Sequence, residues 1–425
     1  MLTRRSFLGA GGATLAAATL GLPRRAWSAG ARVVVVGGGF GGATCARYLL
    51  RLDPSLQVTL VEQDPVFYTC PFSNLVLAGL RRMEDIGHDY RALSERHGVE
   101  VVQAEVSAVD PVARRLTLAD GSSLEAERLV LSPGIDLRWD AVPGYDQAAA
   151  EVLPHAWKAG PQTELLRSQL EAMPDGGVVI IAPPGNPFRC PPGPYERAGL
   201  IAHYLSREKP RSKILILDAK DEFSKQGLFT AAWEELYPGM IEWVSGSSGG
   251  IVSSVDAANH TVATSEGFDK HRGDVVNFIP PQYAAAVARE ADLADESGWC
   301  PVDQATFEST RHPGVYLIGD ACIAGAMPKS GFSANSQAKV CAAALVADLG
   351  GESLPPPSYA NTCYSLAGAD YGISIAAVYR LREGKIVAVE GAGGVSPADA
   401  PTDFRSREAR YAEGWYASIV ADTWG

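Results

Sequence analysis

The succession of apolar runs and polar breaks near the start of the chain predicts an α/β fold. Residues 33–36 are consecutive valines, and a short unbroken run of β-branched residues is typical of a parallel strand buried on both faces. Apolar positions with helical spacing follow over residues 43–50, and residues 57–62 form a second strand-like run that ends in Glu62. Strand, helix and strand in this order predict a unit built on a parallel sheet.

The same pattern recurs further along the chain. We expect strands at residues 177–182 and 213–218 with a helix at 195–205 between them. Another buried strand at 314–318 leads through a loop over 328–335 into a helix that extends past Leu345. These elements predict an α/β protein with two Rossmann-like dinucleotide-binding domains of the disulfide-reductase type and a C-terminal α+β domain. The expected ranges are 29–150 and 285–352 for the first domain, 151–284 for the inserted second domain and 353–425 for the C-terminal domain.

Glycines mark a dinucleotide site in the first domain. Gly37, Gly39 and Gly42 follow the first strand directly, at the spacing that allows a tight turn, a close approach of the backbone to a pyrophosphate and close packing of the next helix. Glu62 ends the second strand, where a ribose hydroxyl needs an acceptor. The second domain lacks such a turn, because residues 183–194 contain six prolines and proline offers no N–H to a phosphate. NAD(P)H is therefore not expected as electron donor or acceptor.

The N-terminal residues and the net charge narrow the cellular setting. Arg4 and Arg5 precede an uncharged run over residues 6–22 and a small-residue cleavage site near Ala29, which is typical of a twin-arginine leader for folded export. We expect removal of residues 1–28 and a periplasmic protein; the alternative is a retained membrane anchor, for which this glycine-rich run is short. The formal net charge of −12 becomes −16 without the four leader arginines. Such a charge disfavours nucleic acid and anionic lipid as partners.

The cysteines and histidines carry further chemistry. Seven cysteines are too few for a disulfide scaffold in 425 residues. Cys45 and Cys341 lie in helical patterns and are expected to be core residues, while Cys300 and Cys322 stay undecided, with packing as the default. The histidines lack metal-ligand spacing and the chain has no Cys-x-x-Cys-His motif, so no metal site is predicted and any haem is expected in a partner. Composition alone leaves the other cysteines as either functional groups or unrelated buried thiols.

Several strings of residues resemble the flavoprotein subunit of flavocytochrome c sulfide dehydrogenase, and the resemblance covers essentially the whole chain after the leader. The matching strings are residues 68–70, 153–160, 188–197, 298–303, 319–322, 327–331, 333–337 and 361–365. In addition, residues 314–320 form an apolar strand ending in Gly-Asp, which resembles the second FAD signature of disulfide-reductase-like flavoproteins. In those proteins the aspartate binds the ribityl chain, and the matching residue here is Asp320.

The resemblance implies the cofactor and the catalytic groups. It implies FAD held covalently by an 8α-thioether to Cys70, and a redox disulfide between Cys190 and Cys363 beside the flavin ring. Glu196 and Trp415 match family positions near that disulfide; Glu196, six positions from Cys190, is expected to accept a proton, with an ordinary surface glutamate as the alternative. The implied reaction is oxidation of hydrosulfide to sulfur or polysulfide, with electrons leaving to a haem-bearing c-type cytochrome subunit docked over residues 353–425.

Two related functions stay open at this point. A sulfide:quinone oxidoreductase shares the fold and the disulfide chemistry, but proteins of that kind bind the membrane through apolar C-terminal helices, whereas residues 407–422 are amphipathic at most. The other alternative is a paralogous flavoprotein that assists a thiosulfate-oxidising system and binds its partner through the same surface.

Overall fold

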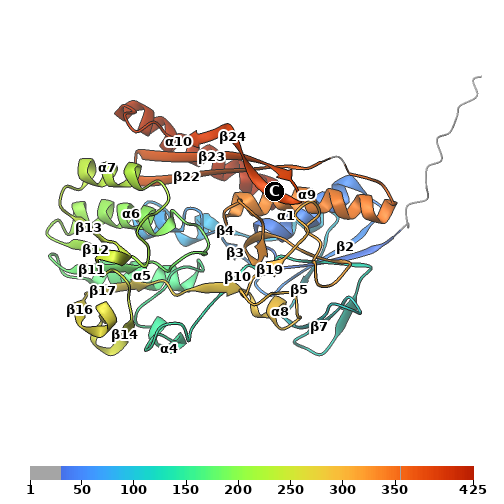
Figure 1. Cartoon of the computed structure of the whole chain (residues 1–425), viewed down its shortest axis with the longest axis horizontal. Helices are drawn as coiled ribbons and strands as arrows, with labels where there is room; N and C mark the ends of the chain where they lie inside the picture. The colour runs from blue at the N-terminus through green and yellow to red at the C-terminus, as the bar shows by residue number, and fades with distance from the viewer. Residues whose placement is uncertain (1–29, 355) are drawn as a thin grey trace, which may run out of the picture.

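The computed structural model describes residues 30–354 and 356–425, so the expected leader lies outside the described residues. The first domain contains a five-stranded sheet, and its strands pair in parallel. In sheet order the strands are β20 (Val315–Leu317), β9 (Arg128–Leu131), β1 (Arg32–Val36), β2 (Gln57–Glu62) and β5 (Glu100–Gln103). Two helices, α1 (Phe40–Leu52) and α9 (Gly331–Gly350), pack against each other beside this sheet (Figure 1).

The second domain repeats this architecture and confirms the predicted α/β fold. Its four-stranded parallel sheet has the order β13 (Ile241–Val244), β12 (Lys213–Leu217), β11 (Val178–Ala182) and β17 (Val275–Phe278). The accompanying helices are α5 (Pro161–Ala172), α6 (Gly193–Glu208) and α7 (Gln226–Leu236). The helix expected at 195–205 starts two residues earlier, because proline is accepted in a first helical turn and Pro194 lies there.

The C-terminal segment forms a long antiparallel sheet and a helix that connect both domains. The sheet consists of β22 (Ser358–Gly368), β23 (Tyr371–Arg382) and β24 (Lys385–Val395), and α10 (Thr402–Thr423) follows it. Strand β22 contacts α6 of the second domain and α9 of the first, and Figure 1 shows the three strands lying across both domains. A residue on β22 can therefore meet groups from both dinucleotide-type folds.

The remaining helices and strands are short and lie mostly in connections. They are β3 (Phe67–Tyr68), α2 (Ser73–Leu77), β4 (Gly87–His88), α3 (Arg91–His97), β6 (Val106–Asp110), β7 (Arg115–Leu118), β8 (Ser123–Glu125), β10 (Ile135–Leu137), α4 (Gln147–Ala150), β14 (Ser254–Asp256), β15 (Thr261–Thr264), β16 (Asp269–Arg272), β18 (Gln282–Ala284), α8 (Ala286–Arg289), β19 (Cys300–Pro301) and β21 (Cys322–Ile323). Helix α9 begins at Gly331, inside the segment expected as a loop, because the Ser330 side chain accepts a hydrogen bond from the N–H of Ser333 and caps the helix.

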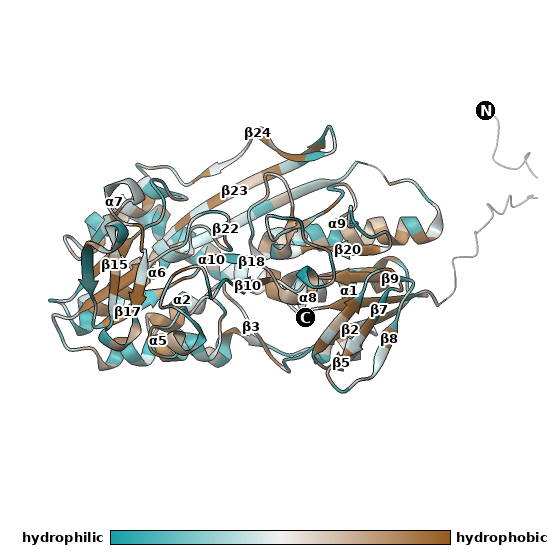
Figure 2. Ribbon diagram, turned by 60° about the horizontal axis from the view of Figure 1, so that its bottom comes forward, coloured by the Kyte–Doolittle hydropathy of each residue, from teal (hydrophilic) through white to brown (hydrophobic). Residues whose placement is uncertain are grey.

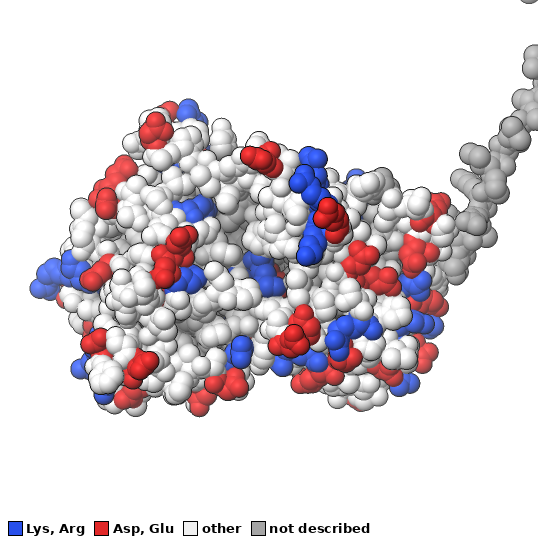
Figure 3. Space-filling view, in the orientation of Figure 1, with Lys and Arg blue, Asp and Glu red and all other residues white. Residues whose placement is uncertain are grey.

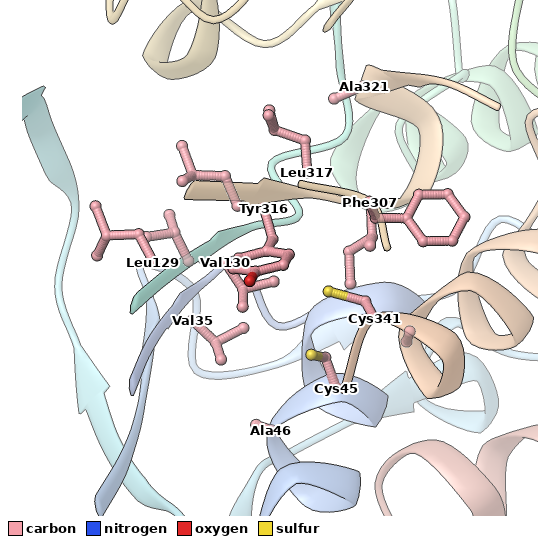
Figure 4. Close-up of a cluster of buried hydrophobic side chains, with 14 of the residues drawn as sticks. Val35, Cys45, Ala46, Leu129, Val130, Phe307, Tyr316, Leu317, Ala321 and Cys341 are labelled. Carbon is pink, nitrogen blue, oxygen red and sulfur yellow. The ribbon is translucent and has the colours of Figure 1, made fainter. Parts of the chain in front are cut away.

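Apolar side chains fill the space between the sheet and the helices of the first domain, and the strands of both sheets are largely hydrophobic in Figure 2. Cys45 on α1 and Cys341 on α9 are fully buried in this core, as expected, and their side chains lie next to each other (Figure 4). Cys300 and Cys322 face each other across β19 and β21, and burial raises the pKa of each to about 12. They therefore stay protonated at neutral pH, which favours a packing role.

Candidate functional site

Three segments far apart in the sequence bring Cys70, Cys190 and Cys363 to one cavity of about 60 Å³. Cys70 lies between β3 and α2, Cys190 in the proline-rich loop before α6, and Cys363 on β22. Glu196 and Trp415 line the same cavity, so the structure brings together the residues expected around the sulfur chemistry. We call this space the cysteine cavity. All three sulfurs are free thiols in this structure, and the Cys190–Cys363 bridge stays a prediction.

The prolines that disrupt a phosphate turn also fix the position of Cys190. Its backbone is left-handed, with φ of 56°, and its N–H donates to the carbonyl of Lys329 at 2.8 Å. Such a conformation is unfavourable for a residue with a side chain, and it is found most often where a functional group must be held. Pro192 then caps α6 directly, so Cys190 and Glu196 lie within one turn of the start of the same helix.

Glu196 faces the cysteine cavity rather than the outer surface. Its carboxylate accepts hydrogen bonds from the Asn74 side chain at 2.9 Å and from the N–H of Leu366 at 2.8 Å. Burial raises the pKa of this carboxyl above its ordinary value, although the two donors oppose the shift. A carboxylate with a raised pKa is a better proton acceptor near neutral pH, which fits the predicted role.

Arg197, which the sequence reasoning did not single out, places a buried cation in the wall of the cysteine cavity. Its guanidinium is only 2% exposed, and its hydrogen-bond acceptors are neutral. They are Asn74 Oδ1 at 3.0 Å, His155 O at 3.1 Å, Ala156 O at 2.6 Å and Asn277 Oδ1 at 2.8 Å. Desolvation lowers the pKa of Arg197 to about 10, so it remains charged at neutral pH and favours anions in the cavity.

Two more functional residues were missed by the sequence reasoning. Asn74 donates to Glu196 and accepts from Arg197, and so bridges the buried carboxylate and the buried cation. Lys225, just before α7, donates from Nζ to the hydroxyl of Ser365 at 2.8 Å, beside Cys363. Arg197 lies inside one of the resembling strings, which was a usable signal. Asn74 and Lys225 lie outside them, and only the tertiary structure brings them to the cavity.

A second cavity, of about 400 Å³, lies on the other side of the Cys190 loop. Its lining includes Asp320 and Lys329 together with Ser330 and Ser333 at the start of α9. Burial raises the pKa of Asp320; one of its oxygens lies 4.0 Å from Arg189, and the other has no partner in the described part of the chain. A buried carboxylate oxygen without a partner is rare and fits a ligand hydroxyl. We call this space the Asp320 cavity.

The glycine-rich turn has the tight packing that a dinucleotide site requires. Gly37 has a positive φ of 94°, and a Cβ at this position would lie 2.4 Å from Ser132 O. A Cβ on Gly42 would lie 1.9 Å from Gly37 O, so only glycine allows α1 to start so close to β1. Glu62 at the end of β2 accepts from the N–H of Gly38 at 2.6 Å, which places its carboxylate at this turn. These residues and the Asp320 cavity fit the two ends of a flavin dinucleotide.

The C-terminal helix holds the Cys70 loop and the glycine turn together. The hydroxyl of Tyr416 lies 2.7 Å from Thr69 Oγ1, next to Cys70, and Trp424 donates from Nε1 to Gly38 O at 3.0 Å. Trp424 also stacks on Phe67, with 5.4 Å between the ring centres. Trp415, from the same helix, lines the cysteine cavity, and its buried indole N–H has no partner within the described ranges.

In the second domain an acidic residue, Asp218, follows the strand whose end would bind a cofactor ribose in a dinucleotide fold. Asp218 directly follows β12 and is fully buried. Its carboxylate accepts from the Tyr195 hydroxyl, from Trp243 Nε1 at 3.0 Å and from Lys220 Nζ at 2.6 Å. These contacts bind Asp218 within the protein itself.

Residues 30–354 and 356–425 contain neither a metal-binding group of side chains nor a helix suited to cross a membrane. No three or more histidine, cysteine or acidic side chains are grouped so that they could hold a metal ion in this part of the chain. None of the described helices has both the length and the apolar composition needed to cross a bilayer.

Protein-family models match three parts of the chain, of which the first two overlap. Residues 31–174 match the pyridine nucleotide-disulphide oxidoreductase family. Residues 163–280 match the central part of the sulfide dehydrogenase (flavocytochrome c) flavoprotein chain, and residues 355–424 match the flavin-binding part of flavocytochrome c sulphide dehydrogenase.

The similar known proteins include a flavocytochrome c flavoprotein chain and sulfide:quinone oxidoreductases. The chain is 71% identical over 45 residues to the sulfide dehydrogenase (flavocytochrome c) flavoprotein chain of Chlorobaculum thiosulfatiphilum, covering 11% of this chain and 94% of that sequence. It is 32% identical over 183 residues to the sulfide-quinone reductase of Aquifex aeolicus, covering 43% of this chain and 41% of the relative. With the mitochondrial sulfide:quinone oxidoreductase of Dictyostelium discoideum the identity is 22% over 299 residues, covering 68% of this chain and 65% of the relative. The chain thus spans about two thirds or less of these two longer relatives.

Solved structures confirm the fold. The sulfide:quinone oxidoreductase from Aquifex aeolicus superposes with a TM-score of 0.69 at 19% identity, covering 93% of this chain and 92% of that one. Putidaredoxin reductase, in its covalent complex with putidaredoxin, superposes with a TM-score of 0.65 at 18% identity, covering 93% and 94% of the two chains.

Proposed function

The chain belongs to the family of flavoprotein chains of flavocytochrome c sulfide dehydrogenase, and we propose that it oxidises hydrosulfide to zero-valent sulfur or polysulfide. The observation that carries this proposal is the convergence of Cys190, Cys363 and Glu196 on one small cavity. A pair of cysteines beside a proton acceptor is what oxidation of a sulfur nucleophile through a disulfide requires.

FAD is the proposed cofactor, and several residues of this chain are suited to hold it. Gly37, Gly39 and Gly42 would face the pyrophosphate, Glu62 a ribose, and Asp320 the ribityl chain. Cys70 opens into the cysteine cavity and would form the thioether that keeps the flavin attached. When bound, the flavin accepts two electrons from the cysteine pair and releases them one at a time. The Cys190 loop lines both the cysteine cavity and the Asp320 cavity, so flavin binding and the cysteine chemistry would lie side by side.

The side chains of the cysteine cavity supply the sulfur chemistry. Hydrosulfide attacks one sulfur of the proposed Cys190–Cys363 disulfide; a new S–S bond forms, the old one breaks, and the products are a persulfide and a thiolate. A second hydrosulfide then attacks the outer sulfur of the persulfide: a new S–S bond forms in the released polysulfide, the cysteine sulfur leaves as a thiolate, and Glu196 accepts the proton that the outer sulfur carried. The positive charge of Arg197 stabilises the anions in this sequence. The reaction is complete when the product leaves and the two cysteines are again oxidised to a disulfide.

The cavity size indicates the class of substrate. The cavity is small, about 60 Å³, and this suits a small nucleophile such as hydrosulfide. The proline-rich loop offers no phosphate turn in the second domain, and Asp218 is already bonded within the protein. The proposed electron acceptor is therefore a c-type cytochrome subunit rather than a nicotinamide. Figure 3 shows acidic and basic side chains interspersed over the face that it draws.

The proposed setting is the periplasm, reached in the folded state by the twin-arginine route. Intact-mass analysis of the exported protein under denaturing conditions tests this setting and the cofactor together. The expected mass lacks the leader and includes one FAD, and the flavin is expected on the peptide with Cys70. Loss of the flavin on denaturation would contradict the covalent link.

The electron acceptor is tested by comparing purified protein with a c-type cytochrome and with a soluble quinone. Sulfide-dependent reduction of cytochrome supports the proposal. Reduction of the quinone together with sedimentation on membranes would instead select a sulfide:quinone oxidoreductase. Inactivity with both acceptors, combined with stimulation of a thiosulfate-oxidising complex, would select the assisting paralogue.

A further inference from the structure

Lys225 places an ammonium group beside the strand that carries Cys363. Its Nζ donates to Ser365 Oγ at 2.8 Å, and Ser365 is two positions after Cys363, on the same face of β22. In the described ranges no carboxylate oxygen lies within 4.0 Å of this Nζ, and its charge lowers the pKa values of both Glu196 and Cys363. An ammonium without a carboxylate partner is free to stabilise another anion nearby.

The two sulfurs of the cysteine pair have different electrostatic surroundings. Burial raises the pKa of Cys363, and the charge of Glu196 on α6 raises it further, whereas Lys225 and the Ser365 hydroxyl oppose this shift. Burial raises the pKa of Cys190 well above its ordinary value, and charge on Cys363, Glu196 and Cys70 raises it further.

The two arginines of the cavity lie on the Cys190 side. Arg189 lowers the pKa of Cys190, and its guanidinium lies 4.0 Å from Asp320 and donates to Trp157 O. Arg197 faces Cys190 and Cys70, and its donors are bound to neutral oxygens. Lys225 is the cation that lowers the pKa of Cys363.

We propose that Lys225, acting through Ser365, is a positioning residue that holds Cys363 as the anionic sulfur of the cysteine pair. Its consequence for the reaction rests on the proposed function. When hydrosulfide opens the bridge, the new S–S bond forms at Cys190 and the electron pair of the broken bond stays on Cys363. The incoming sulfur is oxidised to the outer sulfur of a Cys190 persulfide, the Cys363 sulfur is reduced to a thiolate, and the proton stays on the persulfide until Glu196 accepts it.

The test measures the reactivity of the Cys363 thiol and needs no sulfide. In a Cys190→Ser background, Cys363 has no disulfide partner and stays a free thiol. Its alkylation by iodoacetamide is followed against pH by peptide mass spectrometry. We expect Lys225→Met to slow alkylation at pH 7 about tenfold, which corresponds to a pKa about one unit higher. Lys225→Arg keeps the positive charge and should stay within about twofold of the parent. Identical pH profiles for the parent and the Lys225→Met variant would overturn the proposal.

The same digest reports whether a variant has unfolded. Cys341 is fully buried in the core of the first domain, so its alkylation should remain negligible in every folded variant. If Lys225→Met exposes Cys341, Ser365→Ala takes its place: it removes only the hydroxyl beside Cys363 and is expected to shift the profile in the same direction by a smaller amount. An unshifted profile for folded Ser365→Ala would then overturn the proposal.

The direction of bridge opening is tested separately on protein with both cysteines. One equivalent of hydrosulfide is added without oxygen, and the thiols are trapped within seconds and mapped. A persulfide on the Cys190 peptide together with an alkylated thiol on the Cys363 peptide supports the inference, and a persulfide on Cys363 overturns it. If the bridge does not open at all, the proposed function fails, while the alkylation profile still decides whether Lys225 stabilises the Cys363 anion.

Discussion

Asn74 is the residue whose replacement tests the electrostatics of the cysteine cavity most directly. Its amide donates to Glu196 at 2.9 Å and to Gly193 O at 3.3 Å, and its carbonyl accepts from Arg197 at 3.0 Å. A hydrogen bond to a charged group contributes about 1.5–3 kcal/mol, and a neutral one about 1 kcal/mol. Asn74→Leu keeps a branched side chain of similar shape and removes all three bonds, so we expect a loss of about 4–7 kcal/mol in the free energy of unfolding.

The assay is guanidinium unfolding at pH 7, combined with the pH dependence of sulfide oxidation. Because the Asn74 amide lowers the pKa of Glu196, the variant should also need a higher pH to ionise that carboxyl. Asn335→Leu is the matched control, since Asn335 is a buried asparagine that donates to Asp422 at 2.9 Å, away from the cavity. It should lower stability without moving the pH profile. A loss below about 1 kcal/mol for Asn74→Leu, with an unchanged pH profile, would refute the reasoning.

Three further predictions concern Glu196, the last helix and the contact between α6 and β22. The pKa of Glu196 is raised in the folded state, so its contribution to stability is present below the ordinary value of 4.5 and is lost as the pH rises through the folded value. Glu196→Gln should therefore gain stability relative to the parent between about pH 4.5 and pH 7, as measured by urea unfolding. A stability difference that does not change with pH would argue against a raised pKa. Trp424→Ala should cost about 3–5 kcal/mol because a buried indole is lost, whereas Tyr411→Ala, at a 58% exposed position, should cost less than about 0.5 kcal/mol. Gly199→Ala places a Cβ 2.8 Å from a backbone oxygen of β22, so it should destabilise the protein by about 1–3 kcal/mol and hinder the Cys190–Cys363 bridge. Gly227→Ala, with open space around it, should be neutral or stabilising. Equal melting temperatures for the two variants would refute the close-contact argument.

Local patterns were sufficient to predict the central strands of the two parallel sheets, whereas β5, β9, β13 and β17 were not predicted. The valines of β1, the glycine turn and the acid at the end of β2 are neighbours in sequence, so their geometry follows from short-range rules. The start of α9 was harder to place, because Ser330 acts as a helix cap inside a segment that contains proline and glycine. The residues around a serine do not by themselves distinguish a serine that caps a helix from a serine in a loop.

The cysteine cavity could be predicted only where the resemblance supplied it. Cys70, Cys190 and Cys363 meet because β22 crosses both domains, and such a long-range contact leaves no periodic signal in the sequence. Asn74 and Lys225 contribute through hydrogen bonds to residues more than a hundred positions away. Their importance comes from the burial of charge around them, which is a property of the folded protein.

The cysteine pair is the centre of the account, and its most direct test is an oxygen-free titration of the native protein with hydrosulfide, followed by the visible absorbance of the flavin. We predict that the wild-type protein bleaches with one equivalent of sulfide, and that Cys363→Ser retains its FAD but does not bleach. Bleaching of the Cys363→Ser protein to the same extent would show that sulfide is oxidised without the cysteine pair and would contradict the account.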